Sequence, residues 1–428
     1  MSDKIPLLLY YHKKNKYSFN ALIGALETEG MDEDFDVIFI KNKDILFQIL
    51  DNIIFNHDLT ILCISFFTPQ LWDIYGIIKT IKRRYKEGNL KILAGGPHPT
   101  GDPVGTLAMG FDITVIGEGE ETLIELMKKI QKGQNFEEIK GIGILKDKEQ
   151  YYYSGKRKEV NLDKYAPFPI KHGKFGPIEI TRGCPYQCYY CQTSFLFGKT
   201  PRHRSVETIC KYVQMMKEKD LTDIRFISPN AFSYGSLDGK SINYKKLEEL
   251  LVKTREIIGP NGRIFLGSFP SEVRPEHVNE ETLSLIKNYA SNDNLIIGAQ
   301  SGSTNILKKC NRGHDIDDIY NAVELTIKKG LKVNVDFIFG LPYEIKEDIL
   351  LTIEMMRNLS KLGARIHAHS FIPLPMTPFA KKPVGRIDEA IVNEVKDLIS
   401  RGKAFGDWKK QERIALKVSK YLNKKKIK

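Results

Sequence analysis

Short apolar runs alternate with amphipathic stretches along the first 130 residues of the chain. The runs are rich in Ile, Val and Leu, which is typical of strands buried on both faces of a parallel sheet. They fall at residues 6–10, 36–40, 60–65, 91–95 and 112–116, and helical patterns lie between them near 18–29, 43–55, 69–87 and 120–132. This alternation predicts an α/β domain at residues 1–130, built on a doubly wound parallel sheet.

The residues that follow three of these runs suit a ligand site. Doubly wound sheets bind ligands beyond the carboxyl ends of their strands, and glycines at those ends let a bulky ligand approach the backbone. Turn residues of this kind follow the third, fourth and fifth runs. We expect the ligand contacts at this edge to be Ser65, Gly95, Gly96, Pro97, Gly117 and Glu118.

The alternation of strand and helix resumes after a hairpin and linker expected at residues 131–170. Six strands are expected at residues 178–181, 223–228, 264–267, 295–300, 332–339 and 365–371. Helices are expected near 205–219, 243–258, 280–289, 304–309, 316–329 and 346–361. Six βα units are too few for a full eight-unit barrel. We place this second domain at residues 171–383 and a basic helical segment at 384–428.

The composition is that of a globular protein, with 42% hydrophobic and 28% charged residues in 428. This length is enough for two to three domains. No apolar run approaches the 18 or more residues of a membrane span, and the first residues lack a signal-peptide pattern. Six cysteines in a chain of this length do not indicate a disulfide framework. We therefore expect a cytoplasmic protein with no membrane association.

Most of the net charge of +12 lies at the end of the chain, because residues 401–428 hold eleven Lys and Arg against Asp407 and Glu412, a net of +9. Such a segment can bind nucleic acid or an acidic partner. It lacks interleaved aromatic residues that stack on bases, so nucleic acid is only weakly indicated. An apolar stripe opposite the lysines predicts a helix docked on its own domain. The stripe consists of Ile414, Val418, Tyr421 and Leu422.

The strongest chemical signal is a group of three cysteines, Cys184, Cys188 and Cys191, spaced C-x3-C-x2-C. A 4Fe–4S cluster and a tetrahedral zinc ion both take four ligands. Three thiolates from one loop therefore leave one metal corner free for a substrate or cofactor. At this point a zinc site completed by His203 is the alternative.

This loop, with Tyr190 just before the third cysteine, resembles the signature of the radical S-adenosylmethionine (SAM) enzymes. The resemblance implies that Cys184, Cys188 and Cys191 hold a 4Fe–4S cluster whose free iron is chelated by SAM, and that Tyr190 lies near the adenine. An electron from the cluster would cleave SAM to methionine and a 5′-deoxyadenosyl radical. The resemblance also implies a partial (β/α)6 barrel, with the cysteine loop after its first strand.

Two further segments resemble the family in its SAM pocket. Gln300 and Ser301 follow the expected fourth barrel strand, and Arg312 lies shortly after them. The pattern is similar to one shared by the methylthiotransferase-like and cobalamin-dependent branches, and it implies that Gln300 lines the pocket. Arg312 would pair with the methionine carboxylate, a task suited to a planar bidentate donor. The alternative for Arg312 is a solvated cation at a helix end.

Two other positions are carried over from the family more loosely. Gly340 and Leu341 form a turn that resembles a segment whose backbone contacts adenine, and Asp336 before them is expected to be structural. Asn230 follows the second barrel strand, where many members carry a Gly-Gly-Glu-like turn that this chain lacks. Asn230 offers a carbonyl acceptor to the SAM ammonium, or it is a plain Asn turn.

Ahead of such a barrel, residues 1–130 resemble the cobalamin-binding domain of cobalamin-dependent radical SAM enzymes, of an archaeal-type branch. The Asp-x-His-x-x-Gly motif of methionine-synthase-type domains is missing, and His98 lies in a different loop. In the radical SAM branch cobalamin often binds without a histidine ligand. A vestigial or differently used domain is the alternative.

Together these resemblances imply a cobalamin-dependent methyltransferase that acts on an unactivated carbon and is reduced by a ferredoxin or flavodoxin. A methylthiotransferase-like enzyme is the first alternative, but that family needs three further cysteines in its N-terminal domain, and only Cys63 precedes Cys184. A cobalamin-dependent enzyme that does not transfer methyl groups, and a non-catalytic iron–sulfur protein, are the others. No residue pattern identifies a catalytic acid or base, or the substrate.

Overall fold

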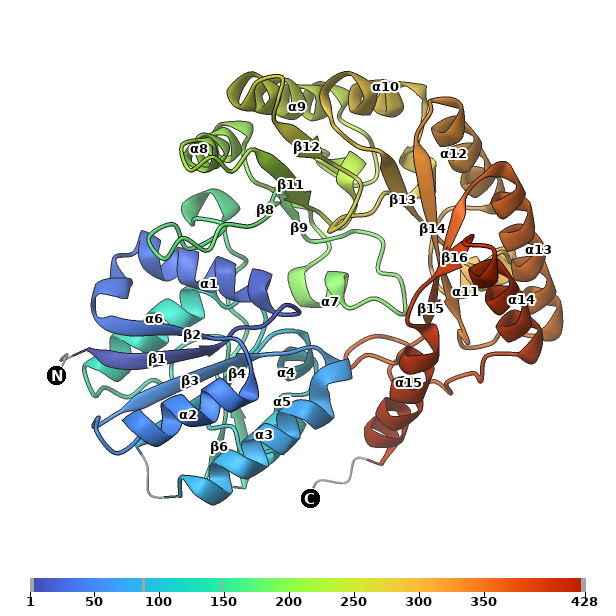
Figure 1. Ribbon diagram of the computed structural model, residues 1–428. Helices are drawn as coiled ribbons and strands as arrows, with labels where there is room; N and C mark the ends of the chain where they lie inside the picture. Colours follow the sequence, from blue (N-terminus) through green and yellow to red (C-terminus); the bar gives the residue numbers. More distant parts are fainter. Residues whose placement is uncertain (1–3, 87–88, 148, 425–428) are drawn as a thin grey trace. The chain divides into compact units, whose positions relative to one another are not determined.

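The computed structural model describes residues 4–86, 89–147 and 149–424, and the chain forms two compact units that divide between Gly176 and Pro177 (Figure 1). We call residues 4–176 the N-terminal unit and residues 177–424 the barrel unit.

The N-terminal unit is built on one seven-stranded sheet (Figure 1). Five strands are parallel in the order β2-β1-β3-β4-β5, and two antiparallel strands extend the sheet beyond β5. The strands are β1 (Ile5–Tyr10), β2 (Phe35–Ile40), β3 (Thr60–Ser65), β4 (Leu90–Gly95), β5 (Ile113–Val115), β6 (Ile142–Lys146) and β7 (Gln150–Tyr153). The doubly wound sheet is confirmed. The hairpin expected at residues 131–170 supplies β6 and β7, so it is part of this sheet.

Helices cover both faces of the parallel strands (Figure 1). Phe19 of the first helix and Leu126 of the last share one core with Leu9 of β1, and all three are fully buried. Leu8 points to the opposite face and is equally buried, which explains why the strands read as continuous apolar runs. The helices are α1 (Lys16–Thr28), α2 (Lys43–Ile53), α3 (Leu71–Arg84), α4 (Pro97–Gly101), α5 (Pro103–Ala108) and α6 (Glu120–Gln131).

The strand order reverses at β1, which pairs with β2 on one side and β3 on the other. Asn15, between β1 and α1, holds the two strand ends together. Its Nδ2 donates to the carbonyl oxygens of Tyr10 at 2.7 Å and Ser65 at 2.9 Å. Such a topological switch point is where doubly wound sheets bind ligands.

The barrel unit contains two parallel sheets, in the orders β12-β11-β8 and β13-β14-β15-β16. A parallel bridge between Val273 and Ile297 joins them into one incomplete barrel. The strands are β8 (Ile178–Glu179), β11 (Asp223–Ile227), β12 (Arg263–Phe265), β13 (Asn294–Gln300), β14 (Lys332–Phe339), β15 (Arg365–Ser370) and β16 (Ala404–Phe405), with a small antiparallel pair of β9 (Thr181–Arg182) and β10 (Arg202–His203).

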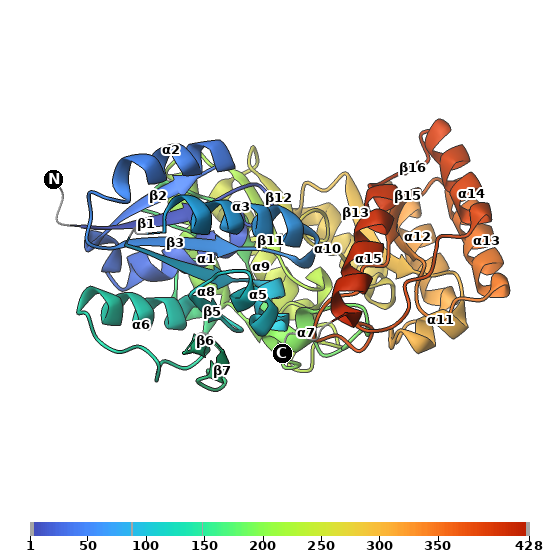
Figure 2. The same cartoon turned by 90° about the horizontal axis from the view of Figure 1, so that it is seen from below.

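Helices α8, α9, α10, α12 and α13 line the outer side of these strands (Figure 1), and α13 packs beside α14 (Figure 2). The helices are α7 (Thr193–Phe197), α8 (Val206–Lys217), α9 (Tyr244–Ile258), α10 (Glu280–Tyr289), α11 (Thr304–Lys309), α12 (Ile316–Lys328), α13 (Lys346–Leu362), α14 (Glu389–Ser400) and α15 (Trp408–Asn423). The partial barrel and the helical C-terminal region are confirmed. Within the described ranges, every helix is too short or too polar to span a membrane.

One strand of the barrel was not expected. β16 adds a parallel edge strand beside β15, inside the segment predicted to be helical. It is only two residues long, so it carries no detectable alternation. The basic helix α15 packs against β15, and Val418 and Leu422 of its predicted apolar stripe are buried.

Burial alternates along β14 and β15 and separates their two faces. Val335, Phe337 and Phe339 are buried on the side of the helices. Asp336 lies on the other side, as do His367 and His369 of β15, and all three are partly exposed. We call this side the inner face of the barrel.

Candidate functional site

The cysteine loop follows the first barrel strand and is shaped by its own backbone. Gly183 has φ of +91°, and a Cβ there would lie 2.4 Å from the carbonyl oxygen of Thr200. No residue except glycine fits such a position. Cys184 N–H donates to Gly198 O at 3.1 Å, and Cys191 N–H to Cys188 O at 3.0 Å. The three predicted ligands are thus held on one folded loop.

The geometry of this loop rejects the zinc alternative. Four-coordinate zinc places its sulfur ligands about 3.8 Å apart, because each Zn–S bond is about 2.3 Å. Among the described residues, the one group of three or more His, Cys, Asp and Glu ligand atoms that all lie within 4.8 Å of one another contains no cysteine. His203 uses both ring nitrogens, at 2.9 Å from Thr181 Oγ1 and 2.8 Å from Ser236 O. At least one pair of the three sulfur atoms therefore lies more than 4.8 Å apart, which is too far for three ligands of one zinc ion.

Burial keeps Cys184 and Cys191 as thiols when no metal is bound. It raises the pKa of Cys191 to about 11 and also raises that of Cys184. A bound iron cluster would hold them as thiolates and release their protons. Nη1 of Arg312 lies 3.8 Å from Cys188 Sγ and places a positive charge beside the cluster position.

Arg312 is buried, with only 5% of its surface exposed. Its Nη2 donates to Gly298 O at 2.8 Å, whereas its Nε has no partner among the described residues. A buried donor without a partner costs free energy unless a ligand accepts from it. This orphaned N–H suits the carboxylate of SAM and contradicts the alternative of a solvated helix-end cation.

Gln300 sits beside Arg312 in a strained backbone. It has φ of +74°, and a bulge between Gly298 and Gln300 interrupts β13. A Cβ at Gly298 would lie 2.6 Å from both Arg312 Nη2 and Gln300 Nε2, so the two side chains converge over this glycine. Strain of this kind gathers at ligand sites. Ser301 differs, because its Oγ accepts from Ser303 N at 3.2 Å and stabilises the turn.

The two residues expected near adenine also come together. Tyr190 packs against an apolar cluster that contains Leu341. Its hydroxyl is buried and has no partner among the described residues. Burial raises the pKa of the Tyr190 hydroxyl. The positive charge of Arg312 opposes this shift, whereas Cys188 and Cys191 reinforce it. A neutral hydroxyl without a partner is thus available to a ligand beside the cysteines.

Gly340 and Asn230 both make close contacts with other parts of the protein. A Cβ at Gly340 would lie 2.7 Å from Gly385 O, so this glycine is needed for close backbone packing. Oδ1 of Asn230 accepts from Arg274 N at 3.2 Å, and its Nδ2 lies 2.7 Å from His277 Nδ1. These contacts favour the plain turn for Asn230 over a contact with the SAM ammonium.

In the N-terminal unit, the predicted glycines leave open space at the carboxyl edge of the sheet. A Cβ added at Gly95 or at Gly117 would have no atom within 4 Å. Gly96 is confined instead, with φ of +94° and a Cβ position 2.7 Å from Ser65 Oγ. Pro97 begins α4. The open positions fit the approach of a bulky ligand to the backbone.

Glu118, also predicted at this edge, has a hydrogen-bond partner within the protein. Its carboxylate is buried and accepts from Val160 N–H at 3.1 Å, so it is committed to the segment that leads out of the sheet. His12, two residues beyond the end of β1, lies at the same edge, with its Nε2 3.0 Å from Nε2 of Gln70.

His314, a buried histidine of the barrel unit, should make the fold less stable in acid. Burial lowers the pKa of His314 to about 2, and Arg312 and Arg274 reinforce this shift. Below about pH 6.5 the unfolded chain binds a proton that the folded chain excludes, so the free energy of unfolding falls with falling pH, by up to about 1.4 kcal/mol per pH unit. We expect His314→Gln to flatten this decline in urea unfolding between pH 7 and pH 5. Equal slopes for the two proteins would contradict the assignment.

Comparison with known proteins defines the class that this fold and site indicate. Residues 178–356 match the model of the radical SAM superfamily, and residues 15–127 match that of the B12 binding domain. The chain thus carries a radical SAM domain and, before it, a B12-binding domain. A radical SAM domain uses a 4Fe–4S cluster and SAM and needs an external reductant, and the B12-binding domain supports cobalamin as a third cofactor.

Two relatives are similar to this chain over most of its length. The uncharacterized methyltransferase PH0819 of Pyrococcus horikoshii is 28% identical over 349 residues, which cover 76% of this chain and 71% of the relative. The putative methylthiotransferase MJ0865 of Methanocaldococcus jannaschii is 29% identical over 346 residues, 78% of this chain and 71% of the relative.

Solved structures share the fold. The radical SAM methyltransferase TsrM from Kitasatospora setae, with cobalamin and a 4Fe–4S cluster bound, has a TM-score of 0.68 at 17% identity and covers 89% of this chain and 77% of its own. The cobalamin-dependent radical SAM enzyme OxsB has a TM-score of 0.64 at 17% identity, with 83% of this chain and 52% of its own covered.

Proposed function

We propose that the protein is a cobalamin-dependent radical SAM methyltransferase that acts on an unactivated carbon. This proposal rests on one observation, that the same chain contains two candidate cofactor sites. The barrel unit holds three cysteines beside the orphaned Nε of Arg312. The N-terminal unit has an open glycine edge at Gly95 and Gly117.

When bound, the cluster, SAM and cobalamin supply the reductive cleavage of SAM and the methyl group that is transferred. The protein supplies positioning. Cys184, Cys188 and Cys191 would hold the cluster and leave one iron for SAM. Arg312 would donate Nε–H to the SAM carboxylate, and Tyr190 would offer its hydroxyl near the adenine. The burial of these groups excludes water from a reactive radical.

A methylthiotransferase is the second candidate, since relatives bear that name. Cys63, the one cysteine before the cluster loop, lies in the middle of β3 and is 6% exposed. Burial raises its pKa to about 12. It is therefore a packed thiol, and the N-terminal unit offers no set of three cysteines for a second cluster. We favour methyl transfer, with a ferredoxin or flavodoxin as the reductant.

The test uses enzyme reconstituted without oxygen from iron, sulfide and hydroxocobalamin, then desalted, reduced and mixed with SAM. We expect about one corrinoid per chain. We also expect 5′-deoxyadenosine from cleavage of SAM, and S-adenosylhomocysteine formed only when the corrinoid is present. Deoxyadenosine without retained corrinoid would overturn methyl transfer and leave a radical SAM enzyme. An intact cluster without deoxyadenosine would indicate a non-catalytic iron–sulfur protein.

A further inference from the structure

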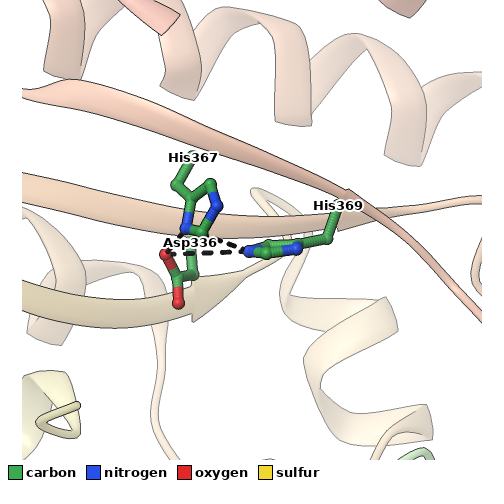
Figure 3. Close-up of side chains that lie close together, drawn as sticks. All are labelled: Asp336, His367 and His369. Carbon is green, nitrogen blue, oxygen red and sulfur yellow. Dashed lines mark hydrogen bonds and ion pairs between the residues drawn. The ribbon is translucent and has the colours of Figure 1, made fainter. Parts of the chain in front are cut away.

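A second group of metal-ligating side chains lies on the inner face of the barrel unit, on two neighbouring strands. Asp336 belongs to β14, and His367 and His369 belong to β15. Asp336 and His367 are register partners, and His369 is two residues further along the same face. Figure 3 shows the carboxylate and both rings turned toward one another. We call these residues the Asp–His–His group.

The separations of the three ligand atoms match a metal ion. His367 Nδ1 lies 2.9 Å from Asp336 Oδ1 and 3.1 Å from His369 Nε2, and the remaining pair is 4.0 Å apart. A triangle with these sides is inscribed in a circle of radius about 2.0 Å, so one point is nearly a metal–ligand bond length, about 2.0–2.2 Å, from all three atoms.

These separations also exclude other cations. An ammonium group hydrogen-bonds at about 2.9 Å and would hold three acceptors about 4.7 Å apart, wider than any pair here. Magnesium and calcium prefer ligand sets of oxygen alone. Two imidazoles and one carboxylate suit zinc, iron(II) and similar divalent transition metals.

Without a cation, the contacts within this group compete for one atom. Nδ1 of His367 is within hydrogen-bonding distance of both Asp336 and His369. A neutral ring places one proton or one lone pair on that nitrogen, so both neighbours must share it. An ion at the common point would instead accept a lone pair from each of the three residues.

Surrounding side chains hold both rings in place. Phe405 of β16 stacks on His367 with ring centroids 4.3 Å apart and an interplanar angle of 9°. The amide of Gln411, on α15, lies 3.3 Å from His369 Nδ1 and accepts from Ser370 N at 2.8 Å. Because Oε1 of Gln411 accepts from Ser370 N–H, its Nε2 faces His369 Nδ1. A metal on His369 Nε2 requires a proton on Nδ1, so metal binding would turn the amide oxygen of Gln411 toward that N–H.

The group lies close to the SAM position. Gly298, whose carbonyl oxygen accepts from Arg312, pairs in register with Asp336 across β13 and β14. Burial raises the pKa of the Glu272 carboxyl, and Arg312 opposes this shift. The negative charge of Asp336 adds to the increase, so Asp336 acts on the same buried carboxyl as Arg312. A metal bound by three protein atoms keeps open positions toward the inner face, where a reacting molecule would lie.

We propose that Asp336, His367 and His369 bind one divalent transition-metal ion, which anchors the substrate through an oxygen or nitrogen atom. The metal binds independently of corrinoid and SAM, so its presence is tested without methyl transfer.

The test titrates zinc into enzyme whose 4Fe–4S cluster is already loaded, so that the cysteines are occupied. After removal of loose metal by a chelating resin, we expect about one zinc per chain in the wild type. His369→Gln and Asp336→Asn should weaken zinc binding by about a hundredfold or more. His57→Gln, a half-buried histidine of the N-terminal unit, is the matched control and should bind zinc normally.

X-ray absorption at the zinc edge identifies the ligands. Nitrogen and oxygen neighbours at about 2.0–2.1 Å, without sulfur at about 2.3 Å, support the proposal. Sulfur neighbours, no retained zinc, or equal zinc in the variants and the wild type would each overturn it. Four irons per chain in every variant show that loss of zinc is not loss of the fold.

Discussion

Replacement of any one of Cys184, Cys188 and Cys191 by alanine is expected to abolish the bound cluster and to lower 5′-deoxyadenosine formation by at least about a thousandfold, or about 4 kcal/mol. Each cysteine supplies one of only three protein ligands, and two thiolates do not hold four irons. Iron and sulfide analysis and the visible absorption of the reconstituted protein measure the first effect. Chromatography of the SAM cleavage products measures the second.

Cys310 is the matched control, because it is a buried cysteine of the same region. It is 1% exposed, its carbonyl oxygen accepts from Tyr189 N–H at 3.0 Å, and burial raises its pKa to about 12. Cys310→Ala should cost about 1–2 kcal/mol of stability and should keep the cluster. Loss of iron in this variant to the same extent, or four irons in Cys188→Ala, would refute the ligand assignment.

Substitution of Gly95 by leucine should remove corrinoid binding while the fold of the N-terminal unit persists. A Cβ at this position has no atom within 4 Å, so the larger side chain projects into the space left for the ligand. Overpacking a ligand site in this way costs about 2–3 kcal/mol, roughly a hundredfold in affinity. Absorbance of the desalted protein after incubation with hydroxocobalamin measures the corrinoid retained.

Gly76→Leu provides the comparison for this variant. Gly76 is exposed on α3 and likewise has open space around its Cβ position. It lies within a helix, not at a strand end. Leucine there should stabilise the helix by about 0.5–1 kcal/mol and leave corrinoid binding intact. Corrinoid retained equally by both variants would show that the open edge at Gly95 is not the binding site.

The sequence predicted the elements of the fold well where they are long and periodic. The continuous apolar run of β3, buried at all six positions, helped to indicate a doubly wound sheet, whereas the partial barrel was implied by the resemblance of the cysteine loop to the radical SAM enzymes. β16 escaped prediction because two residues carry no period, and its pairing with β15 depends on contacts made by the whole barrel.

Within the candidate site, residues with a local spacing were predictable and residues that meet through strand register were not. The cysteines and Arg312 belong to short motifs. Asp336 was expected to be structural, because its partners His367 and His369 lie 31 and 33 positions later and only the pairing of β14 with β15 brings them together. Gly298 was missed because its role depends on a bare Cα beneath Arg312 and Gln300, for which no sequence pattern exists.

The edge strand β16 and the helix α15 also suggest where this scaffold can vary. The side chains around Arg312 and the cysteines come from β13 and from the loops that follow β8, β12, β14 and β15, whereas Phe405 and Gln411 reach the barrel interior from its last edge. Substitutions in residues 404–411 can therefore change the inner face of the barrel beside the Asp–His–His group without disturbing the cofactor contacts. Related enzymes can in this way acquire new substrates through changes in β16 and the start of α15, while the residues that bind the cluster and SAM stay the same.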